Sequence, residues 1–200
     1  MIKAIIFDMG NVIEFYDNKR FLDKFSKHFN VDKKMFEEIE RNNRIKHDLG
    51  KITTRQFIQN LNKGLGKRFT SKEYYALRDK FKIMRWNKEL LTMIKRLRKN
   101  YDIYLLTNNS QPEHQRIIKE GYHKYFDKML FSYTVGVKKP KKKFFEILLK
   151  RTGHSFKECI LVDDRKDICH AVRGYGMQSI IYTNNTQLKK ELQKKSILLK

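Results

Sequence analysis

Four separated segments of this chain carry side chains that together could transfer a phosphoryl group. Asp8 ends the apolar run at residues 2–7, and Gly10 follows two positions later. A buried strand that ends in a carboxylate presents it at the strand's carboxyl end, where open α/β sheets place their chemistry. Three further signals follow in order along the chain: Thr107-Asn108, Lys139-Pro140 and Asp163-Asp164. One nucleophilic carboxylate, one hydroxyl, one lysine and one acidic pair can make a magnesium-dependent phosphoryl-transfer site.

The carboxylates have the residue type that a hard metal ion needs. Phosphoryl transfer requires a nucleophile, positive charge at the phosphoryl oxygens, and a metal held by oxygen ligands. Asp8 can supply the nucleophile and one metal ligand. The Gly10 carbonyl can reach the same ion, because glycine lets the backbone come close. Asp163 and Asp164 complete a carboxylate-rich site that suits Mg²⁺.

Donors and positive charge for the phosphoryl oxygens come from the middle segments. The Thr107 hydroxyl and the Asn108 backbone amide can hydrogen-bond a phosphoryl oxygen, and Lys139 offers a compact charge to the phosphate. Three carboxylates give minus three, while Mg²⁺ and Lys139 give plus two and plus one, so a phosphate dianion would meet a roughly neutral site. Asp167 has two open roles: it provides first-turn charge for a helix dipole, or it orients Lys139 or a metal-bound water.

A parallel sheet would bring these segments together. Helical patterns separate the later apolar runs; one begins after Asn87, which can cap it. Strands that alternate with helices imply an α/β fold with a parallel sheet and right-handed crossovers. The carboxyl ends of all strands then meet at one edge. Five short apolar runs read as buried strands, at residues 2–7, 103–106, 128–132, 159–162 and 179–182.

The segment between the first and second predicted strands differs from the rest. It shows no convincing strand, and Thr53 and Thr70 each begin a capping-box pattern followed by apolar residues at helical spacing. We expect a small helical bundle at residues 15–85, with the aromatic side chains as its core. Residues 1–14 and 86–200 then form the sheet-containing core.

Length and composition describe a globular chain. Its 200 residues are 40% hydrophobic, 34% charged and 12% aromatic, which fits one domain or one domain with an insertion. No apolar stretch is long enough to span a membrane, and residues 1–8 are too short and end too acidic for a secretory signal. Cys159 and Cys169 lack metal-type partners and read as reduced core thiols. A cytoplasmic location is the expectation.

The charge balance is strongly basic. Forty-five basic and 22 acidic residues give a formal net charge of +23, which raises the question of nucleic acid. Lysines are spread over most predicted helices, with local runs at 138–143 and 189–195, so a solvated surface is the preferred interpretation. We expect only non-specific polyanion binding at low salt. The expected partner is a small phosphorylated molecule, with no membrane contact, and the oligomeric state stays open.

The ordered motifs resemble those of the haloacid dehalogenase-like hydrolase superfamily, and the resemblance spans nearly the whole chain. It implies a Rossmann-like core of five parallel strands, an inserted helical cap, Mg²⁺ and an aspartyl-phosphate intermediate. The Phe-Asp-x-Gly-Asn-Val opening is similar to that of bacterial sugar-phosphate phosphatases of the glucose-1-phosphate type. The matching segments are residues 7–13, Leu106-Thr107-Asn108, residues 137–140, Leu161-Val162-Asp163-Asp164 with Asp167, and a cap turn at residues 48–53.

One position departs from the family pattern. Typical phosphatases of this family carry a second Asp two residues after the nucleophile, which protonates the leaving oxygen and later activates water. Here that position is Gly10. Three outcomes are open: Glu14, Asp17 or His47 supplies the proton, the enzyme handles only good leaving groups, or phosphate esters are poor substrates.

Several other functions compete with this interpretation. A 2-haloacid dehalogenase would use the same nucleophile without the missing acid, but it has little use for the Asp163-Asp164 pair. A basic binding protein on a retired catalytic fold would explain Gly10 and the charge of +23. A phosphoacceptor receiver domain places its acidic pair first and lacks the insertion. In the phosphatase interpretation a second anionic group of the substrate could be clamped by basic cap residues, with Arg41, Arg44, Lys46 and Lys51 as candidates.

Overall fold

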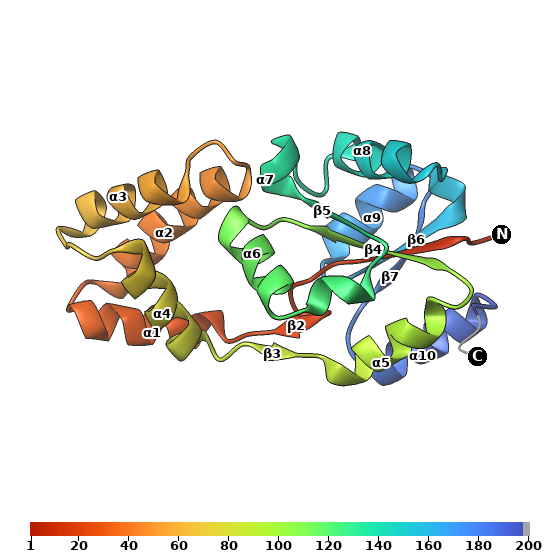
Figure 1. The fold of residues 1–200 in the computed structure, drawn as a ribbon, viewed down its shortest axis with the longest axis horizontal. Coiled ribbons are helices and arrows are strands. Elements are labelled where there is room, and N and C mark those ends of the chain that lie inside the picture. Colours follow the sequence, from red (N-terminus) through yellow and green to blue (C-terminus); the bar gives the residue numbers. More distant parts are fainter. Residues whose placement is uncertain (198–200) are drawn as a thin grey trace.

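Five parallel strands form the central sheet of the computed structural model, which describes residues 1–197. Their order across the sheet is β5-β4-β1-β6-β7, with β1 in the middle (Figure 1). This confirms the predicted Rossmann-like α/β fold, and the strands lie within two residues of the predicted runs. Their bounds are Ala4–Phe7 (β1), Asp102–Thr107 (β4), Lys128–Phe131 (β5), Cys159–Asp163 (β6) and Gln178–Ile181 (β7).

Helices cover both faces of this sheet, which is why the strands are continuously apolar. Alternate β1 residues point to opposite faces: Ile5 and Phe7 pack into one buried cluster, Ala4 and Ile6 into the other. The helices on the first face are α5 (Lys88–Leu97), α6 (Gln111–Lys119) and α10 (Asn185–Lys194); those on the second are α8 (Lys142–Thr152) and α9 (Lys166–Gly174). Asn87 caps α5, as predicted.

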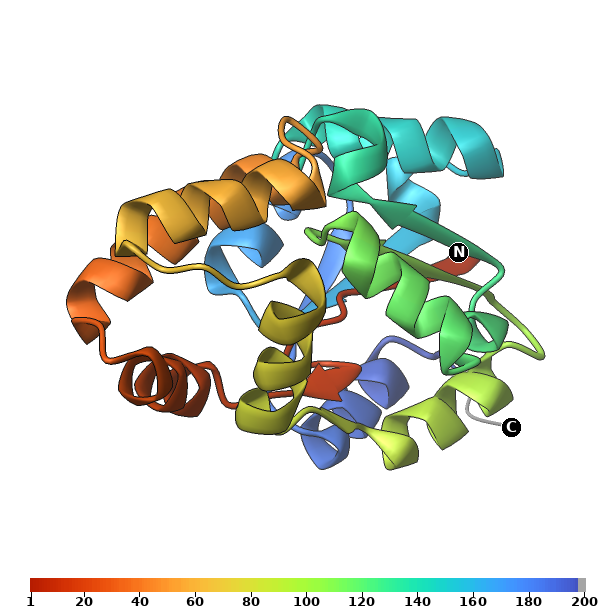
Figure 2. The same ribbon diagram turned by 60° about the vertical axis from the view of Figure 1, so that its left-hand side comes forward.

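Four of the five helices between β1 and β4 form a separate small bundle, called the cap below. They pack around their own aromatic core, in which the Phe25 and Phe36 rings stack with centroids 4.4 Å apart. Both predicted capping boxes, at Thr53 and Thr70, are present. Figures 1 and 2 show the cap beside the edge of the sheet at which β1 ends. The cap helices are α1 (Asn18–Phe29), α2 (Lys33–Asp48), α3 (Thr54–Leu65) and α4 (Ser71–Lys82).

A two-stranded antiparallel ribbon links the cap to the core. The chain leaves the core through β2 (Glu14–Phe15) and returns through β3 (Arg85–Trp86). Figure 1 shows both strands side by side below the sheet. This ribbon is not apparent from the sequence, because two-residue strands are too short to show an alternating pattern. It fixes the direction of the chain on both sides of the cap.

The remaining elements are short. They are η1 (Tyr122–Tyr125), α7 (Ser132–Val135) and η2 (Phe156–Glu158). Cys159 and Cys169 are free and buried, in keeping with the sequence analysis. Among residues 1–197, none of the helices has the length and apolar character needed to cross a membrane.

Candidate active site

The centre of the site is a buried lysine held between two carboxylates. Lys139 Nζ donates to Asp8 Oδ1 at 2.6 Å and to Asp163 Oδ2 at 2.7 Å. Asp8 directly follows β1, and Asp163 ends the neighbouring strand β6, so the parallel pairing of these strands places the two carboxylates side by side. Lys139 is 2% exposed, and Asp163 is fully buried. The segments that carry Asp8 and Asp163 were predicted to converge, and here they meet through Lys139 of a third predicted segment.

The buried ion pairs shift the pKa values of their members. Burial, together with the nearby charge of Asp163, raises the pKa of Asp8 to about 6 against the opposing effect of Lys139. Burial alone would lower the pKa of Lys139, but Asp8 and Asp163 outweigh it and the pKa is raised. Lys139 therefore keeps its proton and its charge at neutral pH.

Asp164 brings a third carboxylate to the same place. One oxygen atom each of Asp8, Asp163 and Asp164 lies within 4.8 Å of the others. Asn11 donates from Nδ2 to Asp164 Oδ2 at 3.1 Å and has a left-handed backbone with φ of 55°. Three clustered carboxylate oxygens suit a hard cation such as Mg²⁺, which the Gly10 carbonyl is predicted to reach as well.

The segment after β4 supports the lysine and presents a hydroxyl. The Asn108 side chain accepts a hydrogen bond from the Lys139 backbone amide at 2.9 Å and donates to the Lys139 carbonyl at 3.2 Å. It thereby holds the lysine's loop, a contribution that the sequence does not reveal. Thr107 is buried, and its Oγ1 accepts a hydrogen bond from Asn109 Nδ2 at 2.9 Å.

A cavity of about 270 Å³ connects these groups to the cap. Asp8, Thr107 and Lys139 line its core side. Tyr16 lines it from the loop between β2 and α1, while Arg44 and Asp48 are among the residues that line it from α2. The segments predicted to converge therefore open into one polar space between core and cap, large enough for a small polar molecule.

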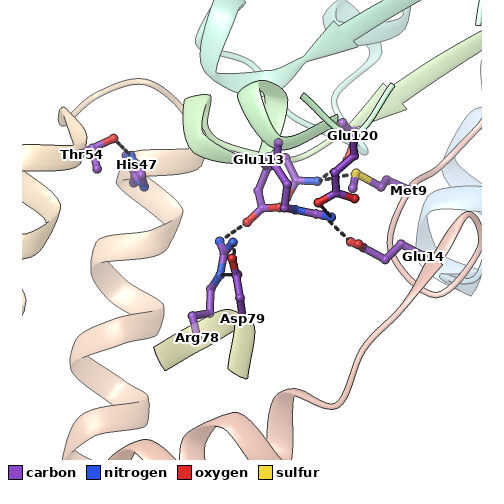
Figure 3. Close-up of polar contacts among 11 residues, drawn as sticks. Met9, Glu14, His47, Thr54, Arg78, Asp79, Glu113 and Glu120 are labelled. Atoms are coloured by element: carbon purple, nitrogen blue, oxygen red, sulfur yellow. Dashed lines mark hydrogen bonds and ion pairs between the residues drawn. The ribbon is translucent and has the colours of Figure 1, made fainter. Parts of the chain in front are cut away.

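Buried ion pairs close this cavity on one side, between cap and core. Arg78 of α4 contacts the Glu113 carboxylate of α6, and Arg116 of α6 donates to Glu14 of β2 at 2.8 Å and to Glu113 at 3.0 Å (Figure 3). Burial by itself would raise the pKa of Glu113, but the two arginines outweigh it and the pKa is lowered. This network joins α4 of the cap to α6 and β2, so it fixes the position of the cap above the sheet.

The structure accounts for the three acids proposed to replace a carboxyl group at position 10. Glu14 is bound by Arg116, although its Oε1 has no hydrogen-bond partner among the described residues. Asp17 caps α1 by accepting from the Arg20 amide at 2.8 Å. His47 contacts Thr54 within the cap at 3.0 Å (Figure 3), lines the cavity, and has its pKa lowered by burial to about 4.

The side chain nearest to position 10 is a tyrosine that sequence reasoning missed. A Cβ atom built on Gly10 would lie 3.0 Å from the Tyr16 hydroxyl oxygen and 3.4 Å from Tyr16 Cε1. Burial raises the pKa of Tyr16 to about 12, and the charges of Asp8 and Asp164 add to this effect. No residue spacing signals this contact, because it depends on how the chain turns back through β2.

Two other groups of predicted residues have different surroundings from those expected. The Asp167 carboxylate contacts Arg165 at 2.5 Å and is exposed, so its partner is this arginine and not Lys139. Of the four basic cap residues considered for a second anion, Arg44 lines the cavity and also contacts Glu40 at 3.4 Å. The other three, Arg41, Lys46 and Lys51, are exposed and lie outside the cavity lining.

Comparison with known proteins places this arrangement in a family. Residues 2–168 match the family model described as haloacid dehalogenase-like hydrolase. A D-ribitol-5-phosphate phosphatase of Bacteroides thetaiotaomicron is 28% identical over 213 residues, covering 96% of this chain and 97% of that protein.

Solved structures show the same fold. A HAD family enzyme of Bacteroides thetaiotaomicron, in complex with magnesium and inorganic phosphate, has a TM-score of 0.80 at 23% identity, over 92% of this chain and 96% of that one. A predicted HAD-like family hydrolase of Porphyromonas gingivalis has a TM-score of 0.85 at 21% identity, over 98% of each chain. An L-2-haloacid dehalogenase of Xanthobacter autotrophicus has a TM-score of 0.64 at 14% identity, over 99% of this chain and 85% of that one.

Proposed function

This chain belongs to the haloacid dehalogenase-like hydrolases, and we propose that it is a magnesium-dependent phosphatase of a small phosphorylated metabolite. One observation carries the proposal: Lys139 bridges Asp8 and Asp163 within a cluster of three carboxylates that opens into the cavity under the cap. The likeness to a D-ribitol-5-phosphate phosphatase supports a sugar or polyol phosphate as the substrate class.

The proposed reaction assigns a task to each residue of the site. The Asp8 carboxylate attacks phosphorus and forms an aspartyl phosphate, which water then hydrolyses. Lys139 holds Asp8 Oδ1 and so sets the angle from which this carboxylate meets the phosphate. The Thr107 hydroxyl and the Asn108 backbone amide donate to the phosphoryl oxygens.

Magnesium is the cofactor in this proposal. Asp8, Asp163, Asp164 and the Gly10 carbonyl would hold the ion, and three clustered carboxylate oxygens fit its preference for hard ligands. The bound ion would neutralise charge on the phosphoryl group. Without it, Asp164 and Asp8 would repel an incoming phosphate, so the proposal requires activity to depend on the metal.

The nucleophile is the sharpest test. Asp8→Asn keeps the size of the side chain but removes its nucleophilic oxygen, so release of phosphate from p-nitrophenyl phosphate with Mg²⁺ should fall at least about a thousandfold. Phosphate is measured colorimetrically, with Asp167→Asn as a matched control because that carboxylate is exposed and pairs with Arg165. Full activity of the Asp8 variant would rule out this mechanism.

Removal of the metal separates this reaction from dehalogenation on the same fold. Excess EDTA should abolish phosphate release, and added Mg²⁺ should restore it. Chloride release from 2-chloropropionate is measured in parallel, because a solved dehalogenase shares the fold. Chloride release that survives EDTA, without phosphate release, would favour the dehalogenase instead.

A further inference from the structure

The proposed phosphatase reaction leaves one proton unassigned. When the bond from phosphorus to the ester oxygen breaks, that oxygen leaves as an alkoxide unless a neighbouring acid protonates it. Lys139 is held by Asp8 and Asp163. The carboxyl groups of Glu14 and Asp17 are bound by Arg116 and by a helix amide. His47 is hydrogen-bonded to Thr54 within the cap, and Glu14 keeps one oxygen, Oε1, without a hydrogen-bond partner among the described residues.

Tyr16 carries an ionisable proton, lines the cavity and lies beside Gly10. Its hydroxyl oxygen lies 3.0 Å from where a Cβ on Gly10 would stand, two residues from the nucleophile Asp8. It lines the same cavity as Asp8, Gly10 and Asp164. We propose that the Tyr16 phenol protonates the leaving oxygen of the substrate, an inference that rests on the phosphatase function.

A second side chain favours the same role. The Lys82 ammonium of α4 lies over the Tyr16 ring, 4.0 Å from its centroid. Lys82 also lines the cavity, and burial lowers its pKa. A cation over the ring stabilises the negative charge that Tyr16 carries after it gives up its proton. Burial raises the pKa of Tyr16, so the phenol keeps its proton at neutral pH and is in the donor form when substrate binds.

The two steps balance in atoms and charge. In the first, an Asp8 carboxylate oxygen bonds to phosphorus, the bond to the ester oxygen breaks, and that oxygen takes the bonding electrons and the Tyr16 proton. This yields the alcohol, the aspartyl phosphate and a Tyr16 phenolate. In the second, water attacks phosphorus and gives a proton to the phenolate, and the Asp8 carboxylate departs. The products are hydrogen phosphate and the original protein.

The Tyr16 side chain also occupies the space that a side chain at position 10 would need. Any side chain at position 10 would press against the Tyr16 hydroxyl at 3.0 Å and the ring carbons at 3.4 and 3.6 Å. A side chain at position 10 therefore requires the Tyr16 side chain to shift by a few tenths of an ångström. The experiment can therefore test both the loss of activity when Tyr16 is changed and its recovery when an acid is placed at position 10.

The test compares two esters that differ in their need for the proton. Wild type and Tyr16→Phe are assayed with Mg²⁺ on D-ribitol 5-phosphate, whose alkoxide needs protonation, and on 2,4-dinitrophenyl phosphate, whose leaving anion is stable without it. Tyr16→Phe should lose about 10²–10⁴-fold in kcat on the alkyl ester and change little on the aryl ester. Tyr122→Phe removes a hydroxyl outside the cavity lining and serves as the matched control.

Two further measurements keep the result decisive. Calorimetric titration with inorganic phosphate and Mg²⁺ should give Tyr16→Phe the wild-type affinity, which shows an intact site. Gly10→Asp in a Tyr16→Ala background should raise alkyl-ester turnover about tenfold or more over Tyr16→Ala alone. A folded double variant as slow as Tyr16→Ala counts against the inference.

Different results would overturn the role of Tyr16 and the phosphatase function. Equal losses of Tyr16→Phe on both esters, or no loss on either, would overturn the role of Tyr16 and leave the phosphatase standing. Wild-type protein that releases phosphate from neither these esters nor p-nitrophenyl phosphate would overturn both.

Discussion

At the scale of single residues, Lys139 organises the site. It is the buried cation shared by two carboxylates from neighbouring strands, and its backbone is held by Asn108. Desolvation of three charges is unfavourable, and only their mutual attraction and good geometry offset it. Such an arrangement is more valuable for positioning a nucleophile than for stabilising a fold.

Removal of this lysine should therefore destabilise the protein as well as inactivate it. Lys139→Met leaves the buried Asp163 and the partly buried Asp8 without their cation, so we expect the free energy of unfolding to fall by about 3–5 kcal/mol at neutral pH. Urea unfolding followed by circular dichroism measures this. Lys143→Met, on the exposed first turn of α8, is the control, and an equal effect of both changes would contradict the argument.

At the scale of elements, helix α2 carries cap residues into the cavity. Asp48 is its last residue, where the negative end of the helix dipole disfavours another negative charge. Burial raises the pKa of Asp48 to about 7, against the opposing effect of Arg44. The end of this helix is also tied to the core, because the Ser132 hydroxyl donates to the Asp48 carbonyl.

The free energy of unfolding should depend on pH because of the Asp48 carboxyl group. The pKa of Asp48 is higher in the folded chain than in the unfolded one, so the folded state binds more protons between about pH 4 and 7, and stability falls as pH rises through that range. Asp48→Asn lacks this loss, so its stability relative to wild type should increase by up to a few kcal/mol over the same range and level off above it.

Urea unfolding at a series of pH values measures this difference, and groups common to both proteins cancel. Glu37→Gln, an exposed carboxyl on the same helix, should show no such trend. A constant difference between the Asp48 variant and wild type would mean that the carboxyl is solvated.

At the scale of the whole molecule, the net charge of +23 contrasts with the balanced interior. The cavity is lined by both signs, with Arg44 and Arg78 beside Glu113 and Asp48, so the excess of lysine acts from the surface. A surface charge of this size attracts any polyanion through counterion release, without reading its sequence.

Binding to nucleic acid should therefore be weak and dependent on salt. A generic oligonucleotide should bind at 50 mM salt, and its affinity should fall about 10³-fold or more by 200 mM if at least six phosphates are contacted. Fluorescence anisotropy across a salt series measures this, with a sequence-scrambled oligonucleotide of the same length as control. Tight binding above physiological salt, together with no turnover, would favour the basic binding protein over the enzyme.

Much of the fold follows from local sequence. The five strands are buried on both faces, so each reads as a short apolar run, and Asn87, Thr53 and Thr70 mark helix starts because capping is a local interaction. The β2–β3 ribbon escaped detection because each strand has only two residues. The split into core and cap at residues 14/15 and 85/86 stays a prediction.

The sequence by itself determined which residues stand at the ends of the parallel strands: Asp8 and Asp163 follow from chain order, because parallel pairing carries strand ends to one edge. Only the tertiary structure decided what surrounds them. Lys139 lies between the two carboxylates, and the Tyr16 hydroxyl fills the space beside Gly10. Loop paths and the placement of the cap set those contacts, and they leave no periodicity in the sequence from which to predict them.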